Sequence, residues 1–226
     1  MSLPFINISY KALVLNKIGT YPSVTNVSLC TKLDPNHVLV KVLFSGICGK
    51  QLEEISGFGG TDPYLPHLLG HEGSGIVEAV GSNVTHVAPN DLVVLHWITE
   101  FQTPPYQLPS IISLESGLAL NAGPITTFAE YSIVLANRVT KVPPDTCPRI
   151  AALLGCGLTT GLGAVFNEAK ICKADRVLVV GCGGVGLSVI QACRIIGLSD
   201  ISAIDISQSA LLQASMCGAT TLMNIS

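Results

Sequence analysis

Short runs rich in β-branched residues recur through the first two thirds of the chain and alternate apolar with polar side chains. Gly, Pro, Asn and Asp separate these runs, which lie at residues 10–15, 37–44, 74–80, 91–95 and 129–135. Such alternation is typical of antiparallel strands that are buried on one face. We therefore predict a β-rich first domain, an antiparallel sheet or barrel, with a long proline-containing loop or lobe at residues 96–127.

The last third of the chain changes to helical spacing and continuous apolar runs. Helices are predicted at residues 147–157 and 159–169, with Pro148 suited to a first turn. Strands are then predicted to alternate with helices at residues 176–181, 182–197, 201–205, 207–219 and 221–225. This order begins a doubly wound parallel sheet, which normally carries about six strands. We expect only half of such a sheet, and therefore a truncated chain or part of a longer protein.

Composition narrows the classes of protein and partner. The 226 residues are 48% hydrophobic and 12% charged, with a net charge of −3, which argues against nucleic acid or an anionic membrane as a partner. The longest uncharged window, residues 177–193, is short for a membrane span and contains four glycines. Without a secretory signal, eight irregularly spaced cysteines indicate reduced thiols. We predict a cytoplasmic protein.

A glycine-rich turn follows the first predicted strand of the parallel sheet. Gly181, Gly183 and Gly186 form G-x-G-x-x-G, with Gly184 and Val185 inside the pattern and an acid, Asp205, at the end of the next strand. The glycines allow a tight turn, close approach of a pyrophosphate and helix–strand packing, and the helix N-terminus offers N–H groups to phosphates. Asp205 would accept hydrogen bonds from a ribose and repel a 2′-phosphate, which favours NAD over NADP. The alternative is a turn without a ligand.

Three residues form a candidate metal set: Cys48, His71 and Cys156. Two thiolates and an imidazole with an open fourth position are a known catalytic zinc set. Zinc there binds an alcohol or carbonyl oxygen and polarises it for hydride transfer. Because 22 and 84 residues separate successive members, spacing alone does not establish the site, and each taken singly is a core cysteine or a hydrogen-bonded histidine.

Five motifs, in order, are similar to those of the zinc-dependent medium-chain alcohol and polyol dehydrogenases: GICG, GHEGSGIVEAVGSNV, NDLVVL, LLGCGLTTGLGAV and VLVVGCGGVG. The resemblance runs from about Lys11 to the end of the chain. It implies a GroES-like β-barrel catalytic domain at residues 1–157, a partial Rossmann dinucleotide-binding domain at 158–226, and an active site in the cleft between them.

The resemblance also implies roles for single residues. The family's zinc ligands fall on Cys48, His71 and Cys156. Glu72 matches a glutamate beside the metal that can transiently ligate it, and Thr160 matches a position near the nicotinamide. Relatives are dimers or tetramers, so a homo-oligomer is expected for the full-length protein.

The sequence departs from the family pattern in two places besides its length. Many relatives carry four cysteines for a structural zinc soon after the strand that corresponds to residues 91–95. This chain has no cysteine between Cys48 and Cys147, so we expect one catalytic zinc and no second metal. Lys50 and Glu53 stand where relatives usually have a hydroxyl and a histidine that carry the substrate proton away. Lys50 would take that proton and Glu53 relay it onward; alternatively, the two form a solvated pair at a helix start.

The leading hypothesis is therefore a zinc-dependent oxidoreductase, or a fragment of one. It would transfer hydride between NAD and a small-molecule substrate, a secondary alcohol, polyol or sugar. A catalytically silent scaffold that binds zinc and nucleotide is a second interpretation, supported by Lys50 and by the missing part of the sheet. A zinc-free quinone or enone reductase of the same superfamily is a third, and the cysteine and histidine ligands argue against it.

Overall fold

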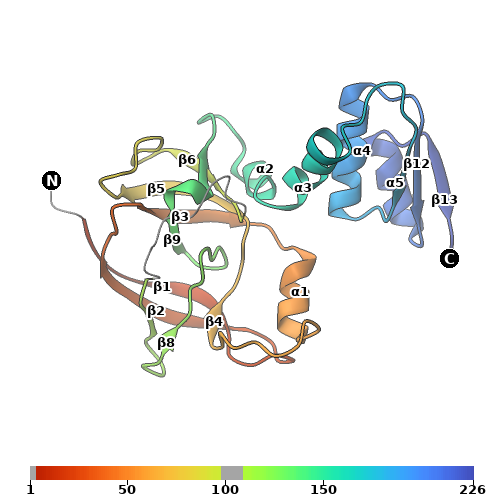
Figure 1. Ribbon diagram of the computed structural model, residues 1–226. Helices are drawn as coiled ribbons and strands as arrows, with labels where there is room; N and C mark the ends of the chain where they lie inside the picture. Colours follow the sequence, from red (N-terminus) through yellow and green to blue (C-terminus); the bar gives the residue numbers. More distant parts are fainter. Residues whose placement is uncertain (1–3, 98–108) are drawn as a thin grey trace. The chain divides into compact units, whose positions relative to one another are not determined.

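The computed structural model describes residues 4–97 and 109–226. The chain divides into two compact units, Met1–Cys156 and Gly157–Ser226 (Figure 1). Each unit has its own hydrophobic core.

The first unit is built on two five-stranded sheets, with strand orders β4-β1-β2-β7-β8 and β10-β6-β5-β3-β9. All its neighbouring strands within named sheets run antiparallel. The strands are β1 (Phe5–Leu15), β2 (Ser23–Lys32), β3 (His37–Ser45), β4 (His67–Leu68), β5 (Gly73–Val80), β6 (Leu92–Leu95), β7 (Ile111–Ser113), β8 (Ala119–Leu120), β9 (Tyr131–Leu135) and β10 (Val139–Lys141). The helices of this unit are α1 (Gly49–Ser56), the 3₁₀ helix η1 (Ala136–Arg138) and α2 (Pro148–Leu153).

The core of the first unit joins the two sheets. Side chains from β1 and β2, such as Val14 and Leu29, pack in one cluster with Leu39 of β3 and Ile133 of β9. A second cluster lies among the valines of β3, β5 and β6, including Val40 and others that are fully buried. In β1, as the sequence pattern predicts, and in β2 buried and exposed positions alternate, whereas consecutive residues of β3, β6 and β9 are buried, so these strands bury both faces.

The five strands predicted in this unit are confirmed, and the structure adds others. The prediction of a long loop at residues 96–127 was wrong in part: β7 pairs with β2 over three residues, and β8 pairs with β7. Residues 98–108 of that segment lie outside the described part of the chain. Strands of two or three residues carry too little alternation to be read from sequence, and their pairing comes from the neighbouring long strand.

The second unit begins with helical segments and continues as a parallel sheet ordered β11-β12-β13. Its elements are α3 (Gly157–Gly163), the π-helix η2 (Ala164–Glu168), β11 (Val177–Val180), α4 (Gly184–Ile196), β12 (Ile201–Asp205), α5 (Gln208–Cys217) and β13 (Thr221–Asn224). The predicted architecture is thus observed: a β-rich domain followed by the first part of a doubly wound parallel sheet.

Capping residues mark both ends of α5. Ser207 caps α5, its hydroxyl accepting a hydrogen bond from the Ala210 N–H, and Gly218 ends that helix in the left-handed conformation at φ 119°. The helices contribute Ile190 and Leu211 to a core that also contains Ile201 of β12. Among the described helices of the chain, none combines the length and apolar character that a membrane span requires.

Candidate metal centre and cavity

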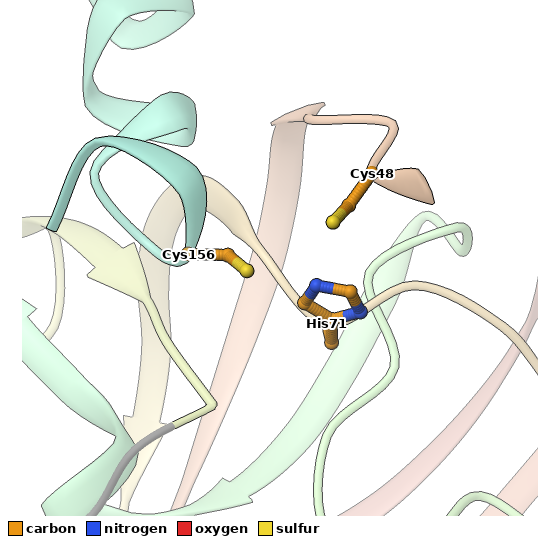
Figure 2. A group of neighbouring side chains, drawn as sticks. All are labelled: Cys48, His71 and Cys156. Carbon is orange, nitrogen blue, oxygen red and sulfur yellow. The ribbon is translucent and has the colours of Figure 1, made fainter. Parts of the chain in front are cut away.

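Cys48, His71 and Cys156 come together in the first unit, each from the end of a different element. Cys48 immediately precedes α1, His71 lies between β4 and β5, and Cys156 follows α2. One ligand atom from each residue lies within 4.8 Å of the other two. Figure 2 shows both sulfur atoms and one ring nitrogen of His71 directed toward a common point. Residues far apart in the sequence therefore form one compact donor group.

Glycines allow the backbone approaches that build this group. Gly70, at φ 94°, makes the turn into His71, and a Cβ there would lie 2.5 Å from Thr127 Oγ1. Gly155, next to Cys156, packs so closely that a Cβ would lie 2.3 Å from the Leu95 carbonyl oxygen and 2.7 Å from the Glu72 Cβ. These close contacts hold the turns that carry His71 and Cys156 against the sheet.

Gln51 connects two of the three candidate ligands, and the sequence analysis missed it. This α1 side chain is only 1% exposed. Its Oε1 accepts a hydrogen bond from the Cys48 N–H at 2.9 Å, and its Nε2 contacts His71 Nδ1. Nε2 is the ring nitrogen that does not face Gln51, and a metal on Nε2 requires the ring proton on Nδ1, donated to an oxygen of the residue 51 side chain. A polar residue three positions after the N-cap, in a helix start that also carries a candidate ligand, was the available signal.

The electrostatics of the donor group suit a dication. Burial, and then the positive charge of Lys50, lower the pKa of His71, which keeps the imidazole neutral at pH 7. Burial, followed by Cys48 and Glu72, raises the pKa of the Cys156 thiol to about 12. A bound cation reverses that second effect, since a coordinating thiol is deprotonated outright. Two thiols and a neutral imidazole within mutual reach are the donor set that zinc accepts.

Glu72 is buried beside the donor group. Its backbone oxygen accepts hydrogen bonds from Ser45 Oγ at 2.9 Å and Thr127 Oγ1 at 3.0 Å. A Cβ built on Gly46 would lie 2.7 Å from the Glu72 carboxylate, so this side chain packs against the turn that leads to Cys48. With Gly155 on its other side, Glu72 lies between the turns that carry the two cysteines.

Lys50 and Glu53 form an ion pair at the start of α1. Lys50 Nζ lies 3.2 Å from Glu53 Oε2, and the side chains are 53% and 41% exposed. This is the contact that the helix-start interpretation predicts. Lys50 also lines a cavity beside the candidate ligands, and the relay interpretation requires it to lie there.

A cavity of about 700 Å³ opens beside the donor group, entirely within the first unit. His71 and Cys156 lie in its wall together with Trp97, whose ring stands 6.4 Å from the His71 ring, centroid to centroid. Apolar side chains of β4 and of residues 122–125 line another part of it. Its polar lining residues are Lys50, Gln51, Glu54, Asp62, Tyr64, His67 and Asn121. The candidate ligands thus face a space large enough for a small organic molecule.

The glycine-rich turn lies in the second unit, between β11 and α4. Gly181 has φ 91°, and a Cβ on Gly186 would lie 1.9 Å from the Gly181 carbonyl oxygen, so only glycine fits there. A Cβ on Gly183 or Gly184 would meet no described atom within 4 Å. No side chain caps the first turn of α4, which includes the half-exposed Val185, so its N–H groups suit an anionic ligand.

Asp205 ends β12 next to this turn. Its carboxylate accepts hydrogen bonds from the backbone N–H groups of Cys182 and Ser207, each at 2.7 Å, and these bonds lower its pKa. Asp205 is therefore a charged acceptor at neutral pH, tied to the glycine turn. Thr160 lies in α3 of the same unit and is exposed.

Both units of the chain resemble known alcohol dehydrogenases in sequence and in fold. Residues 34–144 match the family model of the alcohol dehydrogenase GroES-like domain. The S-(hydroxymethyl)glutathione dehydrogenase of Saccharomyces cerevisiae is 34% identical over 214 residues, which cover 84% of this chain and 55% of the yeast protein.

Two solved structures resemble the chain over nearly all of its length. An alcohol dehydrogenase zinc-binding domain protein from Burkholderia ambifaria has a TM-score of 0.88 at 29% identity, covering 97% of this chain and 65% of that one. Benzyl alcohol dehydrogenase from Acinetobacter calcoaceticus has a TM-score of 0.83 at 31% identity, covering 96% and 64%. The chain is thus similar to alcohol dehydrogenases over nearly all of its length, and residues 34–144, just under half of it, match their GroES-like domain. It spans little more than half the length of the yeast relative.

Proposed function

We propose that this chain contributes the catalytic domain and part of the nucleotide-binding domain of a zinc-dependent oxidoreductase. The enzyme would transfer hydride between NAD and a secondary alcohol, polyol or sugar-type substrate. One observation carries the proposal: Cys48, His71 and Cys156 converge within 4.8 Å in the wall of a cavity of about 700 Å³.

Cys48, His71 and Cys156 would hold the metal, with Glu72 beside them as a further oxygen donor. When bound, zinc supplies Lewis-acid polarisation of the substrate oxygen. Gln51 would fix the His71 ring so that Nε2 faces the cysteines, and the Trp97 ring stands beside His71 in the cavity wall. We propose a single zinc: in the described residues no second group of three ligands occurs, and the sequence holds no cysteine between Cys48 and Cys147.

Lys50 would accept the proton of the substrate hydroxyl after giving one of its own ammonium protons to Glu53 or to solvent. Lys50 lines the cavity and its Nζ lies 3.2 Å from Glu53 Oε2. Since both side chains are about half exposed, a proton that reaches this pair can pass to solvent. The helix-start ion pair is then also the first link of the relay.

The second unit would bind NAD. The turn with Gly181, Gly183, Gly184, Val185 and Gly186 would receive the pyrophosphate at the N-terminus of α4. Asp205 would hydrogen-bond the adenosine ribose and repel a 2′-phosphate, and Thr160 would lie near the nicotinamide. The net charge of −3 supports a small-molecule substrate over nucleic acid or an anionic membrane. The full-length protein would be a cytoplasmic homo-oligomer.

Turnover by the whole gene product tests this function. NAD reduction is followed with a panel of secondary alcohols and polyols, for the zinc-loaded protein and for Cys48→Ser. We expect reduction that falls at least about a hundredfold in the variant, because zinc loses a ligand. Zinc and NAD binding with no turnover of any substrate would instead favour the scaffold interpretation. Zinc-free protein that binds NADPH would favour the reductase.

A further inference from the structure

The cavity of the first unit has a polar wall away from the candidate ligands. Its lining includes the carboxylates of Glu54 and Asp62 and the imidazole of His67, which the proposed hydride transfer does not use. Glu54 belongs to α1, His67 to β4, and Asp62 to the loop between these elements. They lie in the same cavity as His71 and Cys156, so a molecule bound through an oxygen at the candidate ligands can reach this wall.

Asp62 and His67 are fixed in place. His67 Nε2 lies 2.9 Å from Asp62 Oδ2, and the other ring nitrogen lies 2.8 Å from the Leu68 carbonyl oxygen. The second oxygen of Asp62 accepts a hydrogen bond from the Tyr64 N–H at 2.9 Å. Both side chains are largely buried, at 13% and 20% exposure for His67 and Asp62. The pair is therefore a rigid part of the wall.

Glu54 differs from this pair because nothing described donates to it. Its side chain is partly buried and lines the cavity, and within the described residues no hydrogen bond or ion pair engages its carboxylate. Burial raises the pKa of Glu54, while the charges of His67 and Lys50 lower it. A partly desolvated carboxylate is stabilised by hydrogen-bond donors, which a ligand in the cavity can supply.

We propose that Glu54 and the Asp62–His67 pair select a neutral polyol by hydrogen-bonding hydroxyl groups remote from the reacting carbon. This inference rests on the proposed function, because that function places the reacting carbon at the candidate metal ligands. A monohydric alcohol of the same length leaves Glu54 without a donor, and a site with unmatched polar groups rejects such a ligand. A phosphate ester brings negative charge toward two carboxylates, while Lys50 is already paired with Glu53.

Ligand titrations on the chain test this wall. Backbone amide shifts of the labelled chain, with and without zinc, give the Kd for sorbitol, 2-hexanol, sorbitol 6-phosphate and 1-amino-1-deoxysorbitol. These probes keep a six-carbon chain and change only the hydroxyls or the charge. The variants are Glu54→Leu, which removes the acceptors, and Glu54→Gln, which removes the charge. Glu78→Gln, an exposed carboxylate on β5 outside the cavity, is the control.

We expect sorbitol to bind more tightly than 2-hexanol and sorbitol 6-phosphate. Glu54→Leu should weaken sorbitol binding about tenfold or more, since hydrogen bonds to a charged group are lost, and leave 2-hexanol unchanged. Glu54→Gln should narrow the difference in Kd between sorbitol and sorbitol 6-phosphate. Glu78→Gln should leave every Kd unchanged. Equal zinc content and unchanged amide spectra away from α1 would show that the variants fold.

Three results overturn the proposal: no sorbitol binding to the wild-type chain, equal binding of sorbitol and 2-hexanol, or Glu54→Leu without effect on sorbitol. Much tighter binding of 1-amino-1-deoxysorbitol would assign the wall to a cationic ligand instead. A chain that holds no zinc but shows the Glu54 effect contradicts the proposed function and leaves the wall in place. The two failures are thus distinguishable.

Discussion

Gln51 determines the geometry of the candidate metal centre more directly than any other residue outside the ligands. Its buried amide meets the backbone of Cys48 and the ring of His71 at once. Metal-binding histidines generally hydrogen-bond a second group through the nitrogen that does not ligate, and loss of that group weakens metal binding. In this chain a neutral amide does this work.

Replacing Gln51 should therefore weaken zinc binding. We expect Gln51→Ala to raise the zinc Kd about 10- to 100-fold, measured by competition with a chromophoric chelator, because His71 and the Cys48 turn lose their common partner. Gln51→Glu should keep most of the affinity, since a carboxylate accepts from both N–H groups. Leu52→Ala, at the next and exposed position of α1, is the control. Unchanged zinc affinity in Gln51→Ala would contradict this role.

Single residues were predictable from the sequence where a family motif surrounds them. The family motifs around Cys48, His71 and Cys156 singled them out from the eight cysteines and five histidines of the chain. Gln51 did not stand out, because a glutamine in a helix is normally exposed and only the fold shows that this one is 1% exposed. Glu54 and Asp62 likewise resemble surface carboxylates in sequence, and the cavity that they line depends on residues more than 90 positions apart.

At the scale of elements, the turn between α2 and α3 carries Cys156 to the other two candidate ligands. Gly155 packs there against Leu95 of β6 and against Glu72. Gly157, on the other side of Cys156, has no described atom within 4 Å of where its Cβ would lie. The two glycines that flank the cysteine thus make a matched pair, one packed tightly and one open.

Gly155→Ala should displace Cys156. The added Cβ would lie 2.3 Å from a backbone oxygen, so we expect a loss of about 1–3 kcal/mol in the free energy of unfolding of the first unit, and weaker zinc binding. Gly157→Ala should leave the free energy of unfolding and the free energy of zinc binding within about 0.5 kcal/mol of wild type. Urea denaturation followed by the fluorescence of Trp97, the single tryptophan, measures the first unit alone. Equal effects of the two substitutions would refute this packing argument.

Elements were predicted well where the pattern was long and apolar. The parallel strands and α5 agree with prediction because buried strands are continuous apolar runs and Gly218 marks the helix end. The sequence did not reveal β2, which pairs with β1 over ten positions. Its inward positions begin with Thr25, and its serines and asparagine resemble a loop, so only pairing with β1 makes it a strand.

At the scale of the whole molecule, buried histidine makes the stability of the first unit depend on pH. Burial lowers the pKa of His37, and the charge of Asp34 offsets this in part. Above about pH 6.5 the side chain is neutral in both folded and unfolded chains. As the pH falls below that value the unfolded chain binds the proton first, so the folded state loses stability until the folded-state pKa is passed.

Acidification from pH 7.5 to 5.5 should therefore lower the free energy of unfolding, by at most about 1.4 kcal/mol per pH unit for this one group. His37→Gln should show a shallower dependence over the same range, measured by urea denaturation with Trp97 fluorescence. An identical pH dependence in the variant would mean that His37 takes no part in it.

The central claim is that three distant residues of this chain form one zinc site. Zinc content by mass spectrometry, with protein concentration from amino-acid analysis, tests it in the wild type, in Cys48→Ser and in Cys30→Ser, where an exposed thiol on β2 serves as the control. We predict one zinc per chain in the wild type and in Cys30→Ser, and its loss in Cys48→Ser. A wild-type chain without zinc, or a Cys48→Ser chain that keeps it, would contradict the account.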